Sequence, residues 1–87
     1  MAESDLFTIE FPCDWSLRII GPQADNFETM VREVLADHCD ELRNVRLKLS
    51  REGRYTSLNC VITATGEPQL KALHQALLAT GQVKLVL

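Results

Sequence analysis

The chain has 87 residues and a mass of 9.8 kDa, a length that suits one small domain burying about 60% of its unfolded surface. Nine lysines and arginines stand against twelve aspartates and glutamates, for a net charge of −3, and 46% of the residues are hydrophobic. This balance excludes intrinsically disordered, collagen-like and coiled-coil proteins. No apolar run reaches the roughly 20 residues of a membrane-spanning helix, and the acidic N-terminus is unlike a signal peptide.

The cysteines indicate the redox environment. Cys13, Cys39 and Cys60 are an odd number, and no two of them form a C-x-x-C pair. This usage is atypical of a disulfide framework or a zinc site and favours a reducing compartment. We therefore expect a cytoplasmic protein without a metal ion.

The first 15 residues predict an N-terminal arm that packs back on a single domain formed by residues 16–87. The arm is acidic at its start and then rich in aromatic rings, at Phe7, Phe11 and Trp15. Pro12 keeps this segment out of a regular helix. Residues 16–21 follow as an apolar strand that Gly21 and the proline after it end.

A helix is predicted next, with Asp25 and Glu28 spaced as an N-terminal capping pair. Its buried stripe has helical spacing and consists of Phe27, Met30, Val31, Val34, Leu35 and His38. The stripe fails around residues 40–44, where we expect the helix to end.

The second half of the chain predicts a hairpin, a helix and a last strand. Residues 45–50 alternate strictly between apolar and polar, as in a half-buried strand. Residues 51–54 form the turn, and residues 55–64 return with Leu58, Cys60 and Ile62 on one side. Gly66 and Pro68 begin a second helix, which ends at Thr80 and Gly81. Residues 83–87 complete the chain as a strand.

The predicted order is strand, helix, strand, strand, helix, strand, which is the ferredoxin-like α+β arrangement. Right-handed crossovers place both helices on one face of a four-stranded antiparallel sheet, with the strands in spatial order fourth, first, third, second. The alternation of the middle strands agrees with a sheet that is covered on one face only.

The uncovered face of this sheet is the main candidate for function. Its predicted side chains form an apolar strip with a basic border, and the candidate interaction residues are Arg18, Ile20, Arg46, Lys48, Asn59, Val61 and Val86. One interpretation is a solvated face with tolerated aliphatic residues. The other is a contact surface for a second copy of the chain or for another protein.

Other proteins with this fold carry functional residues that this sequence does not match. RNA-recognition domains stack bases on aromatic rings of the central strands, where this chain has Arg18, Ile20, Asn59 and Val61. We therefore expect no nucleic acid partner. Heavy-metal-binding domains carry two thiols in the loop after the first strand, and residues 21–26 of this chain contain none. Acylphosphatases pair an arginine in this loop with an asparagine on the third strand. Asn59 could supply the asparagine, but the loop has no arginine. His38 and His74 are interpreted as structural, and no catalytic residue is assigned.

Several segments resemble the YbeD family of small bacterial proteins. They are the Phe-Pro-Cys-Asp run from Phe11, residues 17–21, the Ser-x-x-Gly-x-Tyr-x-Ser hairpin from Ser50, and the last five residues. The resemblance implies a cytoplasmic, bacterial, non-enzymatic module without a cofactor. It also implies a fold similar to ACT-type regulatory domains, which bind amino acids and pair edge to edge, and genes that lie near those of lipoate attachment.

These observations predict a regulatory or protein-interaction module that acts through the face or edge of its sheet, with a protein partner and a homodimer expected. The alternative is a sensor of a small ligand, an amino acid or an acyl compound, as in ACT domains. Its candidate site is the loop after the first strand, with Gly21, Pro22, Gln23 and Asp25. No membrane association is expected.

Overall fold

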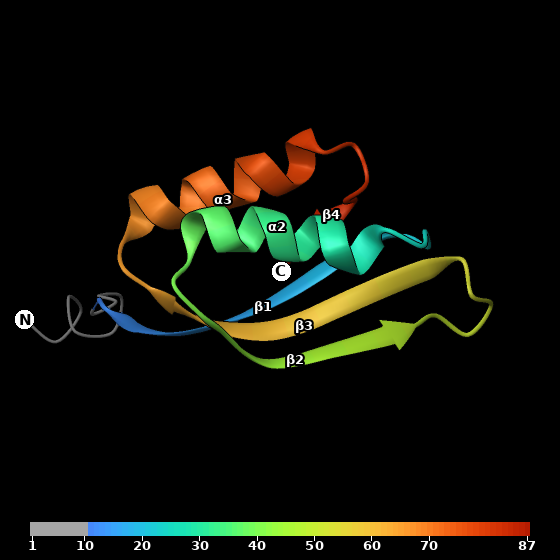
Figure 1. Cartoon of the computed structure of the whole chain (residues 1–87), viewed down its shortest axis with the longest axis horizontal. Helices are drawn as coiled ribbons and strands as arrows, with labels where there is room; N and C mark the ends of the chain where they lie inside the picture. Colours follow the sequence, from blue (N-terminus) through green and yellow to red (C-terminus); the bar gives the residue numbers. More distant parts are fainter. Residues whose placement is uncertain (1–10) are drawn as a thin grey trace, which may run out of the picture.

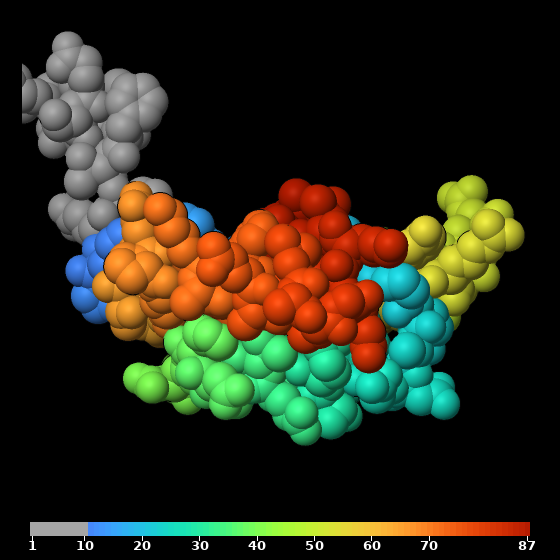
Figure 2. All heavy atoms as spheres, turned by 90° about the horizontal axis from the view of Figure 1, so that it is seen from above, coloured from blue at the N-terminus to red at the C-terminus, as the bar shows by residue number. Residues whose placement is uncertain are grey.

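The computed structural model describes residues 11–87, which form six elements packed in two layers (Figure 1). In chain order these are β1 (Cys13–Pro22), α2 (Phe27–His38), β2 (Leu42–Leu49), β3 (Tyr55–Ala64), α3 (Glu67–Ala79) and β4 (Leu85–Val86). The two helices lie side by side on one face of the sheet (Figures 1 and 2). The predicted fold class and order of elements are therefore confirmed.

The four strands are antiparallel neighbours in the spatial order β2-β3-β1-β4, as predicted. The longest ladder joins β1 to β3, from Cys13 opposite Ala64 to Pro22 opposite Tyr55. Because this pairing continues past Ser16, the strand begins at Cys13, three residues before the predicted domain boundary. Residues 1–10 of the predicted arm, including Phe7, lie outside the described residues.

The core lies between the helices and the sheet. The predicted stripe of α2 is confirmed, with Phe27, Val31 and Leu35 buried at a spacing of four residues. They meet the inward side chains of β3, which are Leu58, Cys60 and Ile62, and the buried leucines of α3. His38 closes the stripe, and its ring nitrogen Nδ1 lies 2.9 Å from the Val34 carbonyl oxygen, as its structural interpretation requires.

The helix ends depend partly on residues that the sequence pattern does not reveal. Asn26, not Asp25, is the N-cap of α2, and no side chain caps this helix, so the predicted capping pair is wrong. The start of α3 is held by Gln69, whose side-chain oxygen accepts a hydrogen bond from the Thr65 backbone N–H at 2.8 Å. The same amide donates to the His38 carbonyl oxygen at 2.8 Å and so joins the two helices. The predicted stop of α3 is confirmed, because Gly81 has a φ of +77°.

The second strand is longer than predicted because it contains a β-bulge. Leu42 and Arg43 pair with β3 in one register, and pairing resumes at Arg46 in a register shifted by one residue. Asn44 at the bulge has a φ of +54°, a conformation that asparagine tolerates better than most residues. Leu42 and Leu47 are five residues apart, so strict alternation would place them on opposite faces. The bulge brings both to the side that the helices cover.

The last strand is shorter than predicted, with two residues instead of five. Its flanks still follow β1, since the Lys84 backbone N–H donates to the Ile20 carbonyl oxygen and Leu87 exchanges two backbone hydrogen bonds with Arg18. The sheet therefore has one short edge at β4 and one long edge at β2.

Replacing Ile62 by alanine tests the placement of the core. Ile62 is fully buried in β3, so Ile62→Ala should lower the free energy of unfolding by about 2–4 kcal/mol through lost transfer energy and a cavity. Urea denaturation followed by circular dichroism measures this change. The matched control is Val61→Ala on the opposite face of the same strand, and a loss in the control as large as that in Ile62→Ala would contradict the assignment of faces.

Candidate functional site

The face of the sheet opposite the helices carries most of the predicted interaction residues. Arg18 and Asn59 are direct partners across β1 and β3, and the Arg18 Nε donates to the Asn59 Oδ1 at 3.1 Å. Arg46 lies opposite Asn59 and Lys48 opposite Ser57, which puts both cations on the same face. Ile20 and Val61 are half-buried there. We call this surface the open face.

Val86 does not belong to the open face, so its predicted orientation is wrong. It pairs with Ile19, whose side chain is buried beneath the helices, and it packs against the core. Its neighbour Leu85 lies opposite Ile20 and takes the outward position, with 46% of its surface exposed. The run Leu85-Val86-Leu87 is apolar throughout, so alternation could not fix which side each residue faces.

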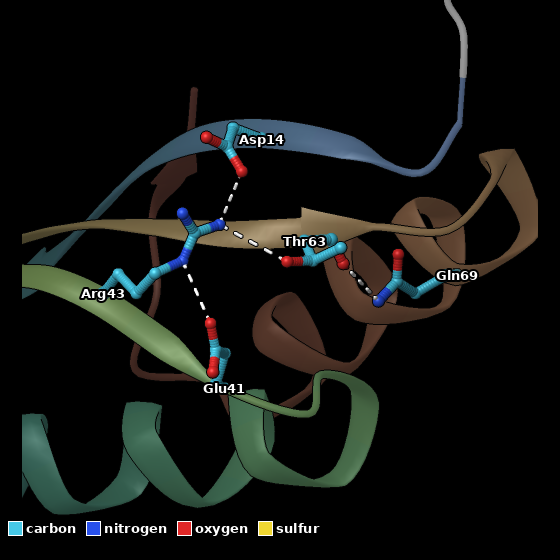
Figure 3. A network of polar contacts seen from close by, with 5 residues as sticks. All are labelled: Asp14, Glu41, Arg43, Thr63 and Gln69. Carbon is cyan, nitrogen blue, oxygen red and sulfur yellow. Dashed lines mark hydrogen bonds and ion pairs between the residues drawn. The ribbon is translucent and has the colours of Figure 1, made fainter.

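A polar network centred on Arg43 crosses the open face and joins three strands (Figure 3). The Arg43 Nη2 donates to the Asp14 Oδ1 of β1 at 2.7 Å and to the Thr63 Oγ1 of β3 at 3.3 Å. Its Nε lies 3.3 Å from the Glu41 Oε1. Sequence reasoning missed this arginine, because the predicted strand begins at residue 45, after the bulge that interrupts the pairing.

The Arg43 guanidinium also controls the ionisation of Asp14. Its hydrogen bond, and secondly its positive charge, hold the pKa of this carboxyl below the usual 3.8. The carboxylate is therefore favoured in the folded chain, and Asp14 is the only acidic residue on the open face of the described strands. Its charge is engaged by Arg43, which leaves the field of this face dominated by cations.

Charge is separated between the two faces of the molecule. The open face carries four cations, at Arg18, Arg43, Arg46 and Lys48. Six of the nine acidic residues in the described part of the chain lie on α2, at its entry and in the segment after it, namely Asp25, Glu28, Glu33, Asp37, Asp40 and Glu41. Such a separation raises the local concentration of oppositely charged partners near each face.

Only two of the four candidate ligand-binding residues line a hollow at the surface. A hollow of about 230 Å³ is lined by Gln23 and Asp25, together with Phe27 of α2 and the two leucines at the end of β2. The Gln23 side-chain oxygen accepts a hydrogen bond from the Thr56 hydroxyl. Gly21 and Pro22, the other two candidates, do not line this hollow.

Gly21 has a packing role that accounts for its identity. A Cβ atom at this position would lie 2.0 Å from the Gln82 carbonyl oxygen and 2.7 Å from the ring of Phe27. The end of β1, to which Gly21 belongs, therefore packs directly against the turn before β4, and only glycine allows this approach.

Burial disfavours ionisation of two of the three cysteines, Cys39 and Cys60, whose pKa values are raised. All three thiols are free, and Cys39 and Cys60 are buried. Burial raises the pKa of Cys60 to about 11, which disfavours the thiolate that nucleophilic chemistry needs. Within residues 11–87, no three histidine, cysteine or acidic side chains lie close enough together to share a metal ion. None of the helices in this part of the chain has the length and apolar character to cross a membrane.

Residues 7–87 match the family described as "Protein of unknown function (DUF493)". The chain belongs to this family. It is 44% identical over 82 residues to a UPF0250 protein of Azotobacter vinelandii, an alignment that covers 91% of this chain and 89% of that protein. The resemblance to a family of small bacterial proteins is thereby confirmed.

Two solved structures share the fold at low sequence identity. Protein HP0495 of H. pylori superposes with a TM-score of 0.74 and 22% identity, covering 97% of this chain and 92% of that one. The ACT domain from the GTP pyrophosphokinase of Chlorobium tepidum gives a TM-score of 0.69 with 19% identity, over 85% of this chain and 94% of that one. The ACT-like form of the ferredoxin-like fold, expected from the sequence, is confirmed.

The Arg43–Asp14 pair predicts a specific pH dependence. Since the pKa of Asp14 is lowered on folding, its contribution to stability is complete above the ordinary value of 3.8 and is lost as the pH falls through the lower folded value. Wild type should therefore be more stable than Asp14→Asn near neutral pH, and the difference should shrink in strong acid. Urea denaturation at both pH values measures it, with Asp25→Asn as the control. A difference that does not change with pH would contradict the pairing.

Proposed function

We propose that this chain is a small regulatory or protein-interaction module that acts through its open face. The observation that carries the proposal is the combination, on one uncovered surface, of free cations and apolar side chains. Arg18, Arg46 and Lys48 border Ile20 and Val61. Asp14 on this face is paired with Arg43, and α2 on the other side of the sheet carries Glu28, Glu33 and Asp37. In protein interfaces, an apolar centre contributes to affinity, and complementary charges around it contribute to specificity.

The chemistry of the face favours a partner with an acidic surface. A second copy of the chain is one candidate, because Val61, Leu85 and Leu87 would pack against their counterparts. Two open faces in contact would, however, also bring their arginines and lysines together, and like charges at such distances destabilise an interface. The proposal therefore favours a different, acidic protein over a homodimer formed through this face.

We also propose that the protein is cytoplasmic and that it is not an enzyme. Three free thiols suit a reducing compartment, which supports the bacterial cytoplasm. The raised pKa of the buried Cys60 thiol and the structural contacts of His38 support a binding role for the domain rather than an enzymatic one.

Capture from a bacterial extract tests the open face directly. The tagged protein should retain one or more acidic proteins, and Val61→Glu should release them, because a carboxylate would replace a central apolar contact. Gln75→Glu on the exposed side of α3 adds the same single negative charge and should leave capture unchanged. Equal capture by all three proteins would contradict the proposal. Light scattering identifies a second copy as the partner if the pure protein is a dimer that Val61→Glu dissociates.

A second candidate function, a small-ligand sensor, is favoured by the hollow beside Gln23 and Asp25. The fold of the ACT domain of Chlorobium tepidum supports the same idea only at the level of architecture. An amino acid or a short acyl acid would be held there by the Gln23 amide and the apolar wall of Phe27. In this case the Gln23–Thr56 hydrogen bond would have to rearrange on binding.

Thermal denaturation with added ligands separates this candidate from the first. A ligand at one hundred times its dissociation constant should raise the stability by about 2.7 kcal/mol. The panel consists of amino acids, lipoate and short acyl acids. A rise that Gln23→Ala abolishes would support the sensor, and no rise with any compound would eliminate it.

A further inference from the structure

The outer edge of β2 is the one long strand edge that the described part of the chain leaves without a partner. β2 pairs with β3 on one side only, whereas the opposite edge of the sheet is formed by the two residues of β4. An unpaired edge of this kind offers backbone donors and acceptors to another strand.

The register identifies which residues offer them. The Ser50 backbone N–H donates to the Tyr55 carbonyl oxygen at 2.8 Å, so Ser50 and Tyr55 form a hydrogen-bonded pair. Hydrogen-bonded and non-hydrogen-bonded pairs alternate along an antiparallel ladder. Lys48 and Arg46 therefore bond to β3, and the N–H and C=O groups of Leu47 and Leu49 point to the free edge.

The same two residues have exposed side chains. Leu47 and Leu49 lie on the side of the sheet that the helices cover, yet 46% and 54% of their surfaces are exposed. Both belong to the edge strand of the sheet, and the hairpin that follows them projects beyond the helix layer (Figures 1 and 2). Both leucines line the hollow of about 230 Å³ beside Phe27. Leu49 also lines a second hollow of about 180 Å³ with Ile20 and Tyr55.

The charges of β2 select the kind of strand that fits. Arg46 and Lys48 lie on the open face of this segment, and β2 contains no acidic residue. A second copy pairing antiparallel would place Lys48 opposite the Lys48 of its partner, or Arg46 opposite Lys48. Like charges directly opposite destabilise a pair of strands, and opposite charges stabilise it.

We propose that the β2 edge binds an extended acidic segment of another protein as a fifth strand of the sheet. The segment alternates apolar and acidic residues. Its apolar side chains pack on Leu47 and Leu49, and its carboxylates lie on the open face beside Arg46 and Lys48. Its backbone bonds to the peptide groups of the two leucines. This inference rests on the proposed interaction function and names the edge and the chemistry of the partner.

The probe is a synthetic peptide that alternates glutamate and valine, labelled for fluorescence anisotropy. It should bind, and the double substitution Arg46→Glu and Lys48→Glu should weaken binding by about tenfold or more, since two attractions become two repulsions. Leu47→Ser should weaken it as well, by removing an apolar contact. Lys71→Glu on α3 is the control for reversing a charge away from the edge and should bind as wild type does. All the substituted side chains are exposed, and circular dichroism verifies that each variant folds.

Amide hydrogen exchange, measured by NMR, locates the bound peptide. Binding at the edge should slow the exchange of the Leu47 and Leu49 amides, which a ligand on the open face would leave unchanged. A peptide that alternates lysine and valine tests the charge, and one that alternates glutamate and proline tests the backbone bonds. Neither should bind.

Three results with the peptides would overturn the inference. They are failure of the glutamate–valine peptide to bind, equal binding by the lysine–valine peptide, and binding that does not protect the two leucine amides. Protection of these amides by dimerisation of the pure protein would also overturn it, because the occupant would then be a second copy. If extract capture still depends on Val61 in any of these cases, the open-face proposal stands and only the edge assignment fails.

Discussion

Two helices can cover only one face of a four-stranded sheet, and most of the other features follow from this constraint. The buried residues of α2 and α3 meet the inward side chains of β1 and β3, and the opposite side chains of the same strands are left to water. Alternation of side chains along a strand then separates the residues that stabilise the fold from those that are free to contact other molecules. In β3 the two sets are interleaved, with Ile62 in the core and Val61 outside it.

The polar features of the open face fall into a structural group and an available group. Arg43 and Asp14 neutralise each other and join β2 to β1 across the middle of the sheet. Gln69 has a similar role at the other layer, where it connects the end of α2 to the start of α3. Arg46 and Lys48 have no carboxylate partner among the described residues, so their charges remain available. The basic character of this surface therefore depends mainly on the outer strand and on Arg18.

The sequence predicts those parts of the fold that have a strong period, and fails where the period is interrupted. The stripe of α2 and the alternation of β3 fix the helix face and the strand face, which is why Arg18, Ile20, Asn59 and Val61 are placed correctly. The face of Val86 is predicted wrongly, because three consecutive apolar residues show no alternation from which a face could be assigned. Arg43 is missed because a bulge follows it. The cap of α2 differs because the helix starts one residue later than the pair Asp25 and Glu28 implies, with Asn26 at the N-cap.

The bulge at Asn44 also has an evolutionary consequence. Two residues of β2 lie opposite Cys60 of β3. This extra residue determines which face of the sheet each side chain from Arg46 to the hairpin occupies. Loss of a single residue from the paired segment beyond the bulge would move the leucines to the face that the cations now occupy, and the cations to the face of the leucines. An insertion or deletion in this segment would therefore keep the leucines and the cations on their present faces only if it changed the length by an even number of residues.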